Sequence, residues 1–191
     1  PIEFPKSYAR DIQSQIADQL EAVENLFQEY PSGVHAVRPN LKRWSGLEAM
    51  VHLNKTMEFY FPQSEQSIAA SVERGQKANT QFVPGFLGSR VTRYMAPKNG
   101  IIRMKIRTMP EFQPEETPTR SRPVLDQFQK LMQDIARLAS KAERVDLGKT
   151  KVRIPRNRLV KFKLGDTYPF ILAHNERHLL QAQRAMESAG K

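Results

Sequence analysis

Apolar side chains recur at steps of three and four residues in four separate stretches of this 191-residue chain. An α-helix places such positions on one stripe, so each stretch predicts an amphipathic helix with one apolar face. The predicted helices cover residues 7–30, 45–74, 123–145 and 166–186, and the second is expected to bend or break at Pro62. Four such faces are buried most economically against one another, which predicts an all-α four-helix bundle.

Local signals mark the helix ends and the connections between them. Ser7, Ser45 and Asp166 are the expected N-caps, and Glu48 completes a capping box with Ser45. Residues 76–122 and 146–166 are expected to be long basic loops, with one short strand at 102–107 after an Asn-Gly turn at 99–100. The length suits a single domain over residues 1–191.

Composition excludes several classes of function. The chain has no cysteine, which rules out disulfides, thiolate ligands and a cysteine nucleophile. No stretch has the roughly eighteen apolar residues of a membrane span, and no leader precedes the first helix, so we expect a cytoplasmic protein without a membrane partner. The net charge of +10 attracts polyanions, although a solvated basic surface explains it equally well.

The histidines are the residues most able to carry chemistry. His174 and His178 are four residues apart, so both imidazoles lie on one face of the last predicted helix. The residues beside them on this helix face are apolar and some are small, which predicts that both histidines point into the bundle. His52 lies in an apolar stretch of the second helix and is expected to face inward too, whereas His35 lies in a Pro/Gly loop and is taken as a surface residue.

Three inward imidazoles on two helices predict a site for a divalent metal ion with His52, His174 and His178 as its ligands. Buried imidazoles need partners, and one ion supplies a partner to all three. Three protein ligands leave a coordination position open, which is typical of a catalytic site and not of a structural one.

Several segments resemble the DinB-like family of four-helix proteins, which includes thiol-dependent S-transferases of the bacillithiol and mycothiol type. The resemblance runs from Trp44 to Met186. It rests on four segments of the chain. The first, at 44–53, contains Trp-Ser at 44–45, Glu48 and Val-His-Leu at 51–53. The others are Met-Pro-Glu-Phe-Gln-Pro at 109–114, Leu-Gly-Asp at 164–166, and His-Asn-Glu-Arg-His-Leu-Leu-Gln at 174–181.

The resemblance implies an up-down-down-up bundle that is often a homodimer. It implies one metal ligand from the second helix and a His-x-x-x-His pair from the last, which fall here on His52, His174 and His178. It also implies zinc or nickel as the ion, while imidazole ligands leave iron, copper and manganese open.

Three functions remain open at this point. The first is a metal-dependent thiol S-transferase or hydrolase, acting on a small-molecule substrate through a thiol, such as a low-molecular-weight thiol, or a water that the ion activates. The second is a metal-stabilised scaffold without catalysis. The third is a basic nucleic-acid-binding protein, which is disfavoured because no nucleic-acid-binding motif occurs.

No catalytic side chain beyond the ligands can be named. Glu48, one turn before His52, is a candidate neighbour of the ion, although its capping role explains it as well. Trp44 lines a pocket or packs as a staple, and Arg177 and Arg184 are taken as surface residues. Substrate contacts are expected from basic loop residues, namely Arg90, Arg93, Arg103, Lys105, Arg107, Lys151, Arg153 and Arg156.

Overall fold

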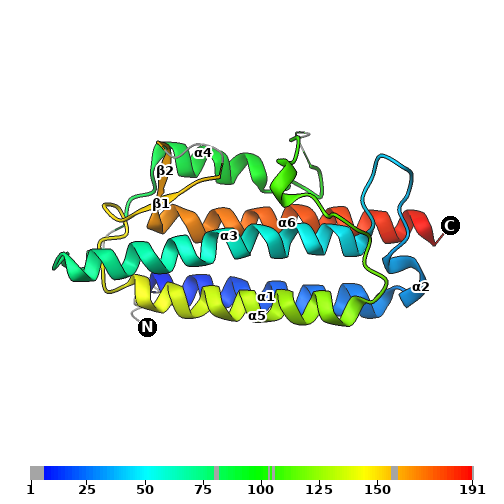
Figure 1. Ribbon diagram of the computed structural model, residues 1–191, viewed down its shortest axis with the longest axis horizontal. Helices are drawn as coiled ribbons and strands as arrows, with labels where there is room; N and C mark the ends of the chain where they lie inside the picture. Colours follow the sequence, from blue (N-terminus) through cyan, green and yellow to red (C-terminus); the bar gives the residue numbers. More distant parts are fainter. Residues whose placement is uncertain (1–6, 80–81, 103, 105, 156–158, 191) are drawn as a thin grey trace.

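Four long helices form the body of the protein (Figure 1). The computed structural model describes residues 7–79, 82–102, 104, 106–155 and 159–190. In chain order the elements are α1 (Tyr8–Glu29), α2 (Ser32–His35), α3 (Gly46–Glu73), α4 (Phe86–Met95), the 3-10 helix η1 (Pro110–Phe112), α5 (Ser121–Ala142), β1 (Lys151–Arg153), β2 (Lys161–Lys163) and α6 (Leu164–Ala189). None of the described helices is both long enough and apolar enough to cross a membrane.

The long helices follow an up-down-down-up order. Helices α1 and α6 run in one direction and α3 and α5 in the other, and α1 and α3 each pack against both α5 and α6 (Figure 1). Apolar side chains from all four helices are fully buried between them, among them Ile12, Leu53, Met57, Phe128 and Ile171. The predicted all-α four-helix bundle is confirmed.

Side-chain caps fix where the first two long helices begin. The Ser7 hydroxyl accepts the backbone N–H of Arg10 at 3.3 Å, and Ser45 and Glu48 form the complete capping box. The second helix does not break at Pro62, since α3 is one helix from Gly46 to Glu73 with this proline inside it, and a bend there remains a prediction. Pro62 and Glu58 both lie on the exposed face, where water can replace the hydrogen bond that proline cannot donate.

The two long connections contain structure that the sequence did not predict. Helix α4 and η1 lie in the first connection, and β1 pairs with β2 in antiparallel register, Val152 opposite Phe162, in the second. The expected turn is confirmed, because Asn99 and Gly100 both have positive φ and Lys98 exchanges two 3.0 Å backbone hydrogen bonds with Ile101. The expected strand at 102–107 is not seen in residues 102, 104, 106 and 107, while 103 and 105 lie outside the described residues.

Helix α4 docks on the start of α6 through a close approach at Gly88. A Cβ atom at this position would lie 2.4 Å from Cβ of Asp166, whose carboxylate accepts the backbone N–H of Gly85. Asp166 is therefore a residue of the α4–α6 contact, and the prediction that it caps α6 is wrong, since the helix begins two residues earlier, after Lys163. Only glycine allows the two backbones to come this close.

Replacing Gly88 with alanine is expected to lower the free energy of unfolding by about 1–3 kcal/mol, because the new methyl group overlaps the side chain of Asp166. Urea unfolding followed by circular dichroism measures this loss. The control is Gly33→Ala, since no atom lies within 4 Å of a Cβ there. Equal stability of the two variants would contradict the close packing of α4 on α6.

Candidate metal centre

Three buried histidines meet between helices α3 and α6. The capping box starts α3 so that His52 comes two turns later on the face toward α6, and His174 and His178 follow one another on the facing side of α6. Their exposed fractions are 4%, 6% and 8%. Burial at this depth places all three imidazoles inside the bundle, as the apolar surroundings in the sequence predicted.

The three rings form a nearly equilateral triangle. The ring centroids of His52 and His174 lie 5.0 Å apart, those of His52 and His178 4.5 Å, and those of His174 and His178 4.6 Å. One ring nitrogen from each residue lies within 4.8 Å of the others, a grouping that could hold a metal ion. The Nε2 atoms of His52 and His174 are 3.2 Å apart, close to the roughly 3.3 Å between two nitrogens on one tetrahedral zinc ion.

Neighbouring groups orient two of the rings. Nδ1 of His52 donates to the backbone carbonyl of Phe112 at 2.8 Å, and Nδ1 of His178 donates to Oε1 of Gln181 at 2.9 Å. Both bonds place the proton on Nδ1, so Nε2 of each ring carries a lone pair that can bind an ion, and in the structure Nε2 of His52 lies within hydrogen-bond distance of Nε2 of His174. His174 differs, because its Nδ1 is buried without a hydrogen-bond partner among the described residues.

The surroundings keep all three imidazoles neutral. Burial lowers the pKa of His52, and burial together with the charges of His52 and Arg177 lowers the pKa of His174 to about 3. Burial and the neighbouring cationic groups also hold the pKa of His178 well below its ordinary value. Neutral imidazoles with depressed pKa values do not have to release protons before they bind a cation at neutral pH.

The same depressed pKa values predict acid sensitivity of the metal-free protein. Each histidine binds a proton more weakly in the folded state than in the unfolded state, so stability present above pH 6.5 is lost as the pH falls. Between pH 7 and pH 5 we expect the melting temperature to fall by roughly 5–15 °C. Differential scanning calorimetry in the presence of a chelator measures the fall.

His178→Gln is the matched variant for that measurement, because an amide does not titrate there. Its melting temperature should depend less steeply on pH than that of the wild type. The pKa of Glu48 is lowered from 4.5 to about 2, so the stability that this buried carboxylate contributes is lost mainly below pH 4.5 and adds little to the slope above pH 5. A wild-type melting temperature that stays constant from pH 7 to pH 5 would contradict the burial of neutral imidazoles.

Aromatic rings surround the histidines. The half-buried ring of Trp44 lies 5.0 Å from that of His52 and 6.1 Å from that of His178, and Phe170 stacks on His174 at 5.9 Å. The backbone of η1 lies over His52, which donates a hydrogen bond to the carbonyl of Phe112. Trp44 therefore lies beside the three histidines, while its two predicted roles, lining a pocket or packing as a staple, remain predictions.

A family model described as the DinB superfamily matches residues 15–182, a range that contains all three histidines. The chain belongs to the DinB superfamily. The comparison with curated proteins found no match, and neither did the comparison with solved structures. Membership of the DinB superfamily does not by itself identify a reaction, so the chemistry of the histidine site follows from its residues.

Two residues of this DinB superfamily protein that were predicted at the surface, His35 and Arg177, are buried in the structure. His35 is not a surface residue but is 4% exposed, and it joins Ser121 at 2.8 Å to the backbone carbonyl of Tyr30 at 2.9 Å. Arg177, also predicted at the surface, is only 7% exposed because residues of the long connection pack over it. Arg184 is exposed as predicted.

Glu48 has a defined structural role in the DinB bundle. It is fully buried, and its carboxylate accepts hydrogen bonds from Arg38, from Thr117 at 2.7 Å and from the backbone N–H of Ser45 at 2.9 Å. These partners lower the pKa of Glu48 to about 2 even though burial opposes ionisation. A role of Glu48 beside the ion remains a prediction, and the structure shows its oxygens bonded to other groups.

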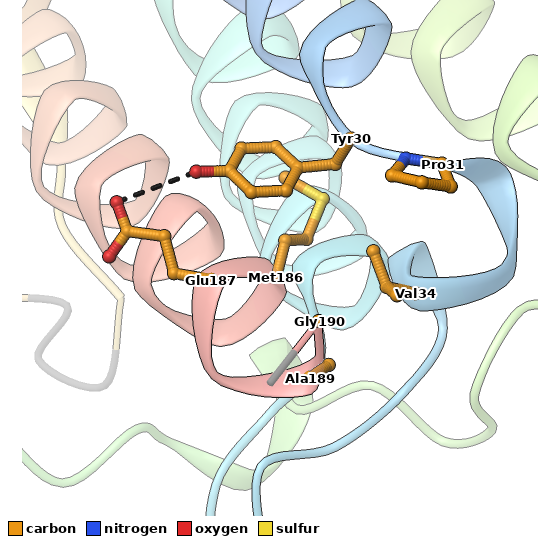
Figure 2. A pocket seen from close by; sticks show the side chains of 7 residues that line it. All are labelled: Tyr30, Pro31, Val34, Met186, Glu187, Ala189 and Gly190. Carbon is orange, nitrogen blue, oxygen red and sulfur yellow. Dashed lines mark hydrogen bonds between the residues drawn. The ribbon is translucent and has the colours of Figure 1, made fainter.

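An open hollow of about 690 Å³ lies near the C-terminal end of α6 (Figure 2), and none of the three histidines lines it. The residues that line it are Tyr30, Pro31, Val34, Met186, Glu187, Ala189 and Gly190. Eight residues of helix separate His178 from Met186, a rise of about 12 Å. This hollow is therefore a feature of the bundle end and does not belong to the histidine site of the DinB fold.

Proposed function

We propose that this protein binds one divalent metal ion through His52, His174 and His178 and uses it for thiol transfer. The observation that carries the proposal is the convergence of three buried, neutral imidazoles from two helices. The ring of His174 adds to it, because its Nδ1 has no partner among the described residues and its Nε2 meets only Nε2 of His52, at 3.2 Å. Zinc and nickel are the ions we expect first.

The donor set determines what such a site can do. Three neutral ligands leave the full charge of a divalent ion uncompensated, and when bound there the ion would lower the pKa of a thiol or a water in its open position. The chain contributes the orientation of the ligands through Phe112 and Gln181. The ring of Trp44 contributes an apolar wall beside the site.

Thiol S-transfer is the reaction that we favour within this proposal. The thiol gives up its proton, its sulfur forms a bond to an electrophilic carbon, and that carbon loses its leaving group. Hydrolysis is the related reaction in which water replaces the thiol. The chain has no cysteine, so the sulfur must come from a small-molecule substrate.

Conjugation of 1-chloro-2,4-dinitrobenzene with a low-molecular-weight thiol tests this proposal. We expect turnover by the metal-loaded protein, and we expect loss of at least about 99% of it on chelation or in His178→Ala, because the ion supplies the charge stabilisation. His35→Gln removes a buried histidine outside the site and serves as the control. Turnover that survives chelation would refute the metal-dependent reaction.

The depth of the site supports one alternative, a metal-stabilised scaffold without catalysis. Ligands that are 4% to 8% exposed leave little room for a substrate unless η1 or Trp44 moves. In that case chelation would lower the melting temperature, but no electrophile would be turned over with any thiol. Steeply salt-dependent binding of DNA or RNA that persists after chelation would instead favour the nucleic-acid alternative.

A further inference from the structure

One of the three residues between His174 and His178 on α6 is a buried arginine, Arg177, that lacks a full set of hydrogen-bond partners. Arg177 is three residues after His174, so the two side chains lie on neighbouring positions of one helix face. Its Nη2 donates to the backbone carbonyl of Met104 in the connection that covers the site. Its Nη1 is buried and has no hydrogen-bond partner among the described residues.

No anion among the described residues compensates this charge. In the part of the chain that the structure describes, no carboxylate forms an ion pair with Arg177, and its sequence neighbour Glu176 lies on the exposed side of α6. Arg177 directly precedes His178 and lies three residues after His174 on α6, so its side chain leaves the helix beside both of these histidines. A divalent ion there would make the whole site strongly cationic, and a buried unpaired charge is unfavourable.

We infer that Arg177 is the anion-binding residue of this site, and that the site takes a small molecule with a carboxylate beside the atom that binds the metal. This inference rests on the proposed metal site. The free Nη1–H bonds of the guanidinium would donate to the carboxylate, while the sulfur of the same molecule occupies the open position of the ion. The ligand would then complete the charge balance that the protein leaves open.

The position of Arg177 also explains why one class of thiol is selected. A neutral thiol leaves the guanidinium unpaired, and a thiol that carries an ammonium group adds a like charge to a cationic site. A carboxylate next to the sulfur satisfies both cations together. Selectivity therefore comes from the charge of the substituent and not from the sulfur.

Cobalt-substituted protein tests the inference, because the visible spectrum of Co²⁺ reports directly on thiol coordination. Mercaptoacetate, 2-mercaptoethanol and cysteamine serve as anionic, neutral and cationic probes. Wild-type protein is expected to bind mercaptoacetate at least about tenfold more tightly than cysteamine, and Arg177→Met should weaken mercaptoacetate binding by about 10–100-fold. Binding of 2-mercaptoethanol should change by less than about threefold.

Arg184→Met is the matched control. Arg184 is also on α6, also donates to a loop carbonyl, that of Gly100 at 2.6 Å, and its removal changes the net charge equally, but it is exposed. We expect it to bind mercaptoacetate as the wild type does. If both variants lose the same affinity, the preference comes from the overall charge and the inference about Arg177 is overturned while the metal site stands.

Two further outcomes are informative. If wild-type protein binds no cobalt, the proposed function and this inference both fail. If Arg177→Met does not fold, Arg177→Lys keeps the charge but not the paired donors, and it should show a smaller loss of mercaptoacetate affinity, of about 3–10-fold. Equal affinity of wild-type protein for all three thiols would overturn the inference whatever the variants do.

Discussion

Replacing His174 with alanine is expected to abolish metal binding. The variant removes one of three ligands and opens a cavity between α3 and α6, so the two remaining imidazoles keep an ion at least about 100-fold more weakly. Metal content of the purified protein, measured by inductively coupled plasma mass spectrometry, should fall from about one ion per chain to less than about one tenth.

The control for this experiment is His35→Gln. His35 is as deeply buried as the ligands, yet it bonds to Ser121 and to the carbonyl of Tyr30 and is not part of the three-histidine cluster. This variant should retain the wild-type metal content. An unchanged metal content in His174→Ala would remove the basis of the metal-dependent function, and circular dichroism of each variant separates loss of the ligand from loss of the fold.

Glu48→Ala is expected to lower the free energy of unfolding by about 2–4 kcal/mol. The carboxylate caps α3 and accepts hydrogen bonds from Arg38, which precedes this helix, and from Thr117, which lies in the connection before α5. It therefore joins both of these segments to the start of α3. The side chain of Arg38 is 42% exposed and can be hydrated after the change, which keeps the loss below that of a fully buried pair. Denaturant unfolding measures the effect.

Metal affinity of the same variant distinguishes the two roles considered for Glu48. If the carboxylate acts only through the fold, affinity should stay within about threefold of the wild type, whereas a group that orients a metal ligand changes affinity about 10–100-fold. Glu115→Ala is the control, because Glu115 pairs with Lys55 at the surface and is 88% exposed, so this variant should be as stable as the wild type.

The bundle and the cluster of three histidines were predictable from the sequence because both depend on local periodicity. Spacing of apolar residues predicts which face of a helix is buried, and the positions of His52, His174 and His178 on those faces then follow. Family resemblance added the helix order, which periodicity alone does not determine. The capping box at Ser45 was predictable for the same local reason.

The parts that were not predicted depend on contacts between distant segments. Arg177 has the sequence context of a surface residue, and only the packing of the connection near Met104 buries it. Helix α4 has ten residues, one of them Gly88, and it is stabilised by its close approach to α6. His35 looks exposed in a Pro/Gly loop because the sequence does not show that Ser121 lies beside it.

The parallel arrangement of α3 and α5 has an evolutionary consequence. Two neighbouring helices that point the same way need a connection as long as the bundle. In this connection Phe112, Met104 and Thr117 form hydrogen bonds with His52, Arg177 and Glu48, respectively. Most of its residues lie outside the interior that holds the four helices together. Mutations and insertions there can change which molecule enters without disturbing the histidines, so ligand preference should diverge among DinB proteins faster than the scaffold does.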